Sequence, residues 1–129
     1  SKDYLASQAD VKNIEQLSTL DNIACLNEGK NAYKPLNPYI TWQDKKIIFK
    51  PRFLINDIPS VIQAVNEHMG FAVLPKNMIL PHVKTGKLIQ LFPEVTLPST
   101  ALYLVYPSRS GQPAKTKAFM EAMMEWSSI

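Results

Sequence analysis

The residues of this sequence best suited to bind a ligand are Asn56 and Asp57, which stand between an apolar run and an amphipathic segment. The run 53–55 is typical of a short buried strand, and a helical pattern begins at Ile58 with Pro59 in its first turn. At such a junction, polar side chains and unpaired backbone N–H groups can hydrogen-bond a small molecule. Asn and Asp are also preferred helix N-cap residues, and capping is the commoner role of such a pair.

Other groups that could do chemistry are few. Cys25 is the single cysteine, and the two histidines, His68 and His82, fall on separate expected elements. The metal-binding, phosphate-binding and nucleophile motifs of known spacing are missing from the sequence. A thiol hydrolase would need Cys25 beside one histidine, whereas a lone cysteine is more often a small core residue. We therefore expect that the chain is not an enzyme and that it binds neither a metal ion nor a cofactor.

The segment 50–75 predicts a strand, a helix and a second strand around this junction. Apolar residues recur at the spacing of one buried helical face: Ile58, Val61, Ile62, Val65 and Met69. Gly70 is expected in the left-handed position that ends a helix, and the apolar run Phe71–Leu74 predicts a buried strand. A strand–helix–strand unit makes a right-handed crossover with parallel strands, and its ligand crevice lies beyond their carboxyl ends.

Shorter elements are expected on both sides of this unit. Before it, the pattern predicts a helical turn around Tyr4, a short helix at 14–20 capped by Asn13, a strand at 23–26, a loop at 27–38, and a hairpin of strands 39–42 and 46–49. After it, the pattern predicts a helix or turn at 76–83, strands at 88–92 and 101–106, and a last helix that begins near Pro113. The apolar face of that last helix comprises Phe119, Ala122, Met123 and Trp126.

Composition indicates an ordinary globular domain. The chain has 129 residues, of which 46% are hydrophobic and 19% charged, enough for one core. Its net charge of +3 is too small to indicate nucleic-acid binding by itself. No apolar run reaches the roughly 18 residues that span a bilayer, and the N-terminus lacks a signal pattern. We therefore expect a cytoplasmic protein that makes no contact with membranes.

Several short motifs occur together in one order and spacing. They are Asn56-Asp57, Gly70-Phe71-Ala72-Val73-Leu74-Pro75, Gly86-Lys87-Leu88, Leu91-Phe92-Pro93, Leu102-Tyr103-Leu104-Val105-Tyr106-Pro107 and Ala118-Phe119. This set resembles the effector-binding domain of the LysR-type transcriptional regulators, and the resemblance extends from end to end. One departure is His68, because the family often has glycine two residues before the glycine that matches Gly70.

The resemblance implies a fold and a division of the chain. The fold is α/β, a Rossmann-like subdomain of the type 2 periplasmic-binding-protein kind, with a mixed, mainly parallel sheet flanked by helices. Residues 1–98 would form the second effector-binding subdomain. Residues 99–129 would be a return segment, a strand and a helix that complete the first subdomain. Without that subdomain, residues 101–126 are expected to fold back or to pair with another copy of the chain.

The resemblance also implies a function. A small effector, often anionic, binds between the two subdomains and changes how a tetramer holds DNA through a separate N-terminal winged helix-turn-helix domain. By position in the family, the effector-binding residues of this chain would be Asn27, Glu28, Phe53, Leu54, Asn56, Asp57 and Phe71. The alternative is a solute-binding protein of the same fold that delivers its ligand to a transporter.

Overall fold

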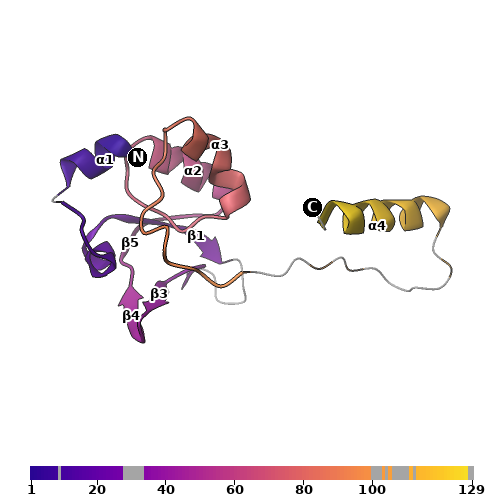
Figure 1. Ribbon diagram of the computed structural model, residues 1–129, viewed down its shortest axis with the longest axis horizontal. Helices are drawn as coiled ribbons and strands as arrows, with labels where there is room; N and C mark the ends of the chain where they lie inside the picture. The colour runs from indigo at the N-terminus through magenta and orange to yellow at the C-terminus, as the bar shows by residue number, and fades with distance from the viewer. Residues whose placement is uncertain are drawn as a thin grey trace. The chain divides into compact units, whose positions relative to one another are not determined.

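The structure, a computed structural model, describes residues 1–8, 10–27, 34–99, 103, 105, 111 and 113–127 (Figure 1). The chain divides into two compact units, Ser1–Leu97 and Pro98–Ile129. The first unit contains a sheet with helices, and the second contains the helix α4 (Ala114–Ser127). Each unit is described by itself below.

The strand β1 (Asn22–Asn27) is the centre of a three-stranded sheet in the first unit. On one side it pairs in parallel with β5 (Pro51–Ile55), and on the other side it pairs antiparallel with β2 (Lys34–Pro35). The predictions of β1 and β5 are confirmed. The expected loop at 27–38 was wrong in part, because it contains the two-residue strand β2. The mixed sheet with its helices confirms an α/β architecture.

The strand expected at Phe71–Leu74 is reduced to one bridge. Phe71 pairs in parallel with Asn22, and its carbonyl oxygen accepts a hydrogen bond from the Ile23 N–H at 2.8 Å. Further along the same edge of β1, the Leu36 N–H donates to the Cys25 carbonyl oxygen. The side chains of this segment still alternate as in a strand. Phe71 and Val73 pack in one hydrophobic core of the first unit, and Ala72 and Leu74 pack in a second hydrophobic core.

The helix α2 (Ile58–Asn66) begins as the sequence predicts, with Asp57 as N-cap and Pro59 in the first turn. Its end was predicted wrongly. The left-handed residue is His68, at a φ of 63°, and the helix stops before Met69. The Met69 N–H donates to the Ala64 carbonyl and the His68 N–H to the Val65 carbonyl, which is the Schellman pattern of a helix end.

Glycine is required at position 70, but not because this residue ends the helix. Its φ is 156°, and a Cβ at this position would collide with the backbone carbonyl oxygen of Asp21. The Phe71 N–H donates to that same carbonyl at 2.9 Å. Glycine therefore lets the chain that leaves α2 approach the start of β1 closely.

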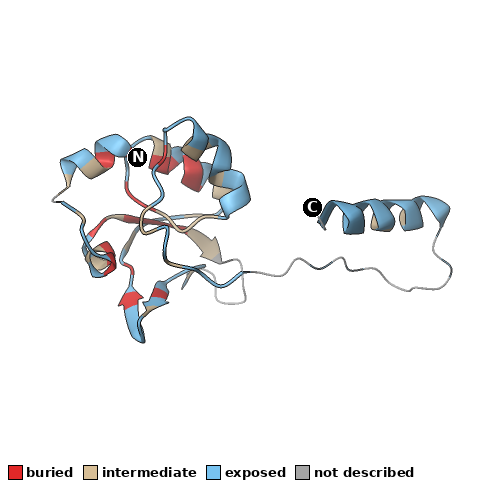
Figure 2. Cartoon of the chain, in the orientation of Figure 1, coloured by how far each residue is buried: buried red, intermediate tan, exposed pale blue. Residues whose placement is uncertain are grey.

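Two hydrophobic cores lie on opposite faces of the sheet (Figures 1 and 2). Toward α2, the buried residues are Ile23, Val61, Ala64, Val65 and Leu88. Toward the 3-10 helix η1 (Ile14–Thr19) and the hairpin of β3 (Tyr39–Trp42) and β4 (Lys45–Ile48), they are Ile14, Leu17, Leu20, Ile40, Ile47, Phe49 and Phe71. Figure 2 shows buried residues along β1 and on the inward side of α2.

The remaining elements of the first unit are short. The helix α1 (Lys2–Ser7) confirms the expected helical turn, and α3 (Lys76–Lys84) settles the choice between helix and turn. Asn13 and Gln16 form the capping box that starts η1. The hairpin turns at Gln43 and Asp44, which both have positive φ, as a two-residue hairpin loop requires.

The strand expected at 88–92 was wrong. Leu88 is buried beneath α2, and Phe92 has a φ of 49°, which no β-strand accepts. Of the strand expected at 101–106, only Tyr103 and Val105 fall within the described residues, and both are exposed without strand structure. The last helix is confirmed as α4, and none of its residues is buried. Among the described residues, no helix combines the length and apolar character needed to cross a membrane.

Candidate functional site

The candidate site is the edge of the sheet where β1 and β5 both end. Because these strands are parallel and Cys25 lies opposite Ile55, their carboxyl ends reach the same edge. Asn27 is the last residue of β1, and Asn56 and Asp57 follow β5 directly. The structure describes only the backbone of Asn27, and Glu28 lies outside the described residues. The register therefore brings Asn56 and Asp57 to the same edge as the end of β1.

Asp57 places a negative charge at this edge. Its Oδ1 accepts a hydrogen bond from the Ser60 N–H at 2.8 Å, and its carbonyl oxygen accepts from the Val61 N–H at 3.2 Å. Hydrogen bonds from the backbone and the side chain of Ser60 lower the pKa of Asp57 below its ordinary value. The carboxylate is therefore ionised at neutral pH, at the positive end of the α2 dipole.

The start of α2 offers little to an anion. Pro59 has no N–H group, and the N–H groups of Ser60 and Val61 already bind Asp57. A second negative group placed here would meet the Asp57 carboxylate rather than a set of open donors. This end of the helix is suited instead to a ligand that presents a hydrogen-bond donor to Asp57, with the exposed Asn56 beside it.

Two apolar side chains flank this edge on β5. Phe53 is 38% exposed and Leu54 is 41% exposed, because β5 ends the described sheet and both of its faces reach solvent. The two residues are adjacent in a strand, so they point to opposite faces. The Arg52 guanidinium lies 5.5 Å from the Phe53 ring centroid and also pairs with Asp21 at 3.0 Å. A ligand on one face of β5 therefore contacts only one of these two apolar side chains.

Phe71 lies away from this edge. It is 9% exposed and packs edge-to-face against Phe49, with the ring centroids 5.2 Å apart. It pairs with Asn22, five residues before Asn27, which corresponds to about 16 Å along the strand. The structure thus places Phe71 in the core at the amino end of β1.

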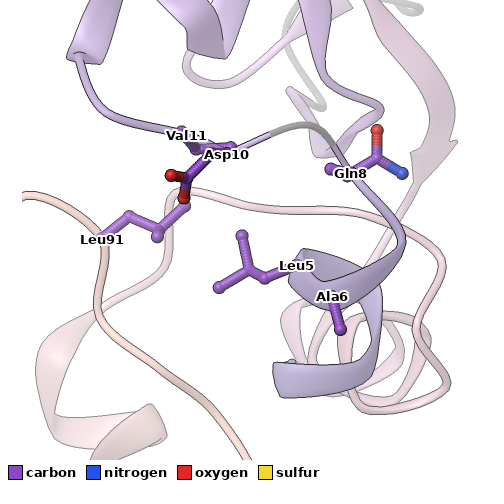
Figure 3. Close-up of a pocket in the computed structure, with 6 residues that line it drawn as sticks. All are labelled: Leu5, Ala6, Gln8, Asp10, Val11 and Leu91. Carbon is purple, nitrogen blue, oxygen red and sulfur yellow. The ribbon is translucent and has the colours of Figure 1, made fainter.

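A separate pocket of about 340 Å³ opens between α1, the segment that follows it and the segment after α3 (Figure 3). Its lining residues are Leu5, Ala6, Gln8, Asp10, Val11 and Leu91. In Figure 3 the Asp10 carboxylate lies near Leu91, with Leu5 across the pocket. Of the residues expected to bind the effector, those whose side chains the structure describes do not line this pocket. No local sequence signal indicates it, because Leu91 comes from a distant part of the chain.

The structure gives no support for a thiol or metal site among the described residues. Groups of three or more His, Cys, Asp or Glu side chains that could hold a metal ion are absent from them. His68 contacts Ser1 and Asp3, and His82 Nδ1 lies 3.3 Å from Asn66 Nδ2. Cys25 packs against the core between α2 and β1.

Comparison with known proteins assigns the chain to a family. The sequence model of the LysR substrate binding domain matches residues 1–128. The HTH-type transcriptional regulator PtxR of Pseudomonas aeruginosa is 32% identical over 74 residues, a match that covers 57% of this chain and 24% of PtxR. The chain thus matches about a quarter of the length of this relative. No solved structure matches the chain. The chain therefore belongs to the LysR substrate-binding domain family.

Proposed function

We propose that this chain is the ligand-sensing part of a LysR-type transcription regulator, in which a small-molecule effector modulates DNA binding and transcription. The family match over residues 1–128 and the regulator PtxR support this proposal. The structural observation that carries it is the shared edge of β1 and β5, where Asn56 and the ionised Asp57 lie beside exposed apolar side chains. Such an edge is the usual ligand site of a parallel α/β sheet.

In this proposal residues 1–98 form the second effector-binding subdomain, and residues 99–129 return to a first subdomain. The effector binds between the two subdomains. It can change their relative arrangement only through a difference in affinity for the open and closed forms. A winged helix-turn-helix domain elsewhere in the regulator contacts DNA, and the regulator acts as a tetramer in the cytoplasm.

The chemistry of the edge restricts the effector. We propose that it donates a hydrogen bond to Asp57 or Asn56, and that its apolar part contacts Phe53 or Leu54, with Asn27 and Glu28 at the end of β1 completing the wall. An anionic group on the effector would bind away from Asp57, because like charges repel. Phe71 is only 9% exposed, so in this proposal it stabilises the core behind the wall and does not contact the effector.

The experiment uses the full-length regulator that contains this chain. A library of small metabolites is screened for molecules that raise its melting temperature, and each hit is then tested for a change in the binding of operator DNA. A hit that changes both properties supports a sensing regulator. Hits that bind without any change in DNA binding, together with export of the protein, would favour the solute-binding alternative.

A further inference from the structure

The pocket beside α1 has the size and lining of a small-molecule site. Its volume of about 340 Å³ is at the lower end of the range for such sites, and it has room for roughly ten non-hydrogen atoms. Leu5, Val11 and Leu91 line it with apolar side chains that are only partly buried. The polar side chains on its wall are Gln8 and Asp10 (Figure 3). An apolar cleft with a few polar groups is the usual composition of a ligand site.

Two walls of this pocket are held in place by hydrogen bonds. The Gln16 side chain holds the segment 10–13: its Nε2 donates to the Asp10 carbonyl oxygen at 3.4 Å, and its Oε1 accepts from the N–H groups of the residues at 12 and 13 at 2.7 and 2.9 Å. On the side of α1, the hydroxyl of the buried Tyr4 accepts from the Asp21 N–H at 2.9 Å. Because both walls are fixed without a ligand, binding orders few further groups.

The third wall contains a strained backbone. Phe92, which follows Leu91, has a φ of 49°, and a bulky aromatic residue rarely adopts this left-handed conformation. Both side chains pack against the core that contains Ile14 and Phe71, so the surrounding fold maintains the strain. Backbone strain of this kind is concentrated at ligand sites. It is an observation independent of the pocket's volume and lining, and it supports the same assignment.

The pocket lies at the other end of the sheet from the edge formed by Asn56 and Asp57. Tyr4 of α1 binds Asp21, directly before β1, whereas that edge lies where β1 ends at Asn27. The strand spans about 16 Å between its first and last residues. A molecule of roughly ten non-hydrogen atoms therefore cannot occupy both places.

We propose that this pocket is a second ligand site, separate from the effector edge, and that it binds a small molecule with an ammonium group and a short hydrocarbon part. The Asp10 carboxylate accepts hydrogen bonds from the ammonium group. Its ion pair with Lys12, at 3.5 Å, is between two exposed side chains and is therefore weak, so the ligand displaces it at little cost. The hydrocarbon part covers the partly buried apolar side chains of the pocket. An anion of the same shape is repelled by Asp10.

Methyl NMR of the full-length protein that contains this chain tests the proposal, with isopentylamine as the probe. Binding is expected to shift the methyl signals that line the pocket, which are those of Leu5, Ala6, Val11 and Leu91. The methyl signals of Leu54, at the effector edge, are the internal control and should not shift. A Kd on the order of 1 mM is expected for so few atoms. The neutral isopentanol should bind about two- to fivefold more weakly than the amine, and the anion isovalerate more weakly still.

Three variants separate the charge from the cavity. Asp10→Asn keeps the shape of the side chain and should remove the preference for the amine over the alcohol. Asp44→Asn, at an exposed aspartate in the hairpin turn, is the matched control and should keep that preference. Ala6→Leu fills the pocket from an exposed position of α1 with a good helix former, and it should abolish the probe-induced shifts at Leu91.

The proposal is overturned if the pocket methyl signals do not shift at ten times the expected Kd, or if the largest shifts are at Leu54. Equal affinities for isopentylamine and isovalerate in the parent would also contradict it. A preference for the amine that persists in Asp10→Asn, or is lost equally in Asp44→Asn, would show that Asp10 does not select the ligand.

Discussion

Asp57 has a structural task at the start of α2 that can be measured without the effector. Replacing it with alanine removes the acceptor of the Ser60 N–H, and we expect the melting temperature of the chain to fall by roughly 5 °C. Asp57→Asn is the matched control, because asparagine caps helices equally well, and its melting temperature should stay near that of the parent. Equal losses in both variants would mean that the charge, not the cap, is what matters.

The pH dependence of this cap has a defined sign. Hydrogen bonds from Ser60 lower the pKa of Asp57 in the folded chain, so the ionised cap contributes stability above about pH 4 and loses it as the pH falls through the folded-state pKa. Between pH 5 and pH 3 the melting temperature of the parent should therefore fall more than that of Asp57→Asn. Parallel curves for the two proteins would contradict the assigned shift.

Gly70 and Gly86 provide a matched pair for the cost of a Cβ atom. Both have positive φ, but a Cβ at Gly70 would collide with the Asp21 carbonyl, whereas nothing lies within 4 Å of one at Gly86. We expect Gly70→Ala to lower the free energy of unfolding by about 2 kcal/mol or more, and Gly86→Ala by about 1 kcal/mol. Urea denaturation measures both values, and equal losses would show that the close approach at Gly70 is unimportant.

At the scale of the elements, α2 depends on its buried face. Val65 is 6% exposed and belongs to the core between α2 and β1. An unpaired charge at this position costs several kcal/mol, a large share of the roughly 5–15 kcal/mol that stabilise a domain, so Val65→Asp should unfold the first unit. Circular dichroism during thermal melting checks this. Gln63→Lys, on the exposed face of the same helix, should melt like the parent, and a cooperative melt of Val65→Asp would contradict the assigned face.

The sequence predicted the elements whose signals are local. The start of α2 follows from Asp57 and Pro59, and the hairpin follows from two β-rich runs around a short turn. The strands that were predicted wrongly depend on contacts with other parts of the chain. The strand after Gly70 is reduced to one bridge, and Leu36 pairs with Cys25 further along the same edge of β1. The run at 88–92 is broken by the left-handed Phe92. Such effects depend on residues far apart in the chain, which local patterns do not register.

The candidate site, like the secondary structure, could be predicted from the sequence only in part. Asn56 and Asp57 follow from the strand-to-helix junction, and the resemblance to the family adds the end of β1. The burial of Phe71 depends on Phe49, and the pocket beside α1 depends on Leu91. Neither could be predicted from a single run of residues. The occupation of the α2 amides by Asp57 likewise required the geometry of the cap.

At the scale of the whole molecule, α4 exposes a large apolar surface. Phe119 is 57% exposed and Trp126 is 62% exposed. Exposed surfaces of this kind drive association when no other partner covers them, so we expect the 129-residue chain to form dimers or larger assemblies at micromolar concentrations. Sedimentation velocity measures the mass, and a Phe119→Ser, Trp126→Ser double variant should shift it toward the monomer. A parent chain that stays monomeric at 100 µM would contradict this expectation.

The central claim is that the edge formed by Asn56 and Asp57 senses an effector, and the response of the full-length regulator to its effector tests it most directly. Asn56→Leu should weaken the effector-dependent change in operator binding at least tenfold while the melting temperature stays within a few degrees, because Asn56 is exposed and Asp57 supplies the cap. Asn77→Leu, at an exposed asparagine of α3, is the control and should respond like the parent. An unchanged response in Asn56→Leu, or an equal loss in Asn77→Leu, would contradict the assignment of the site.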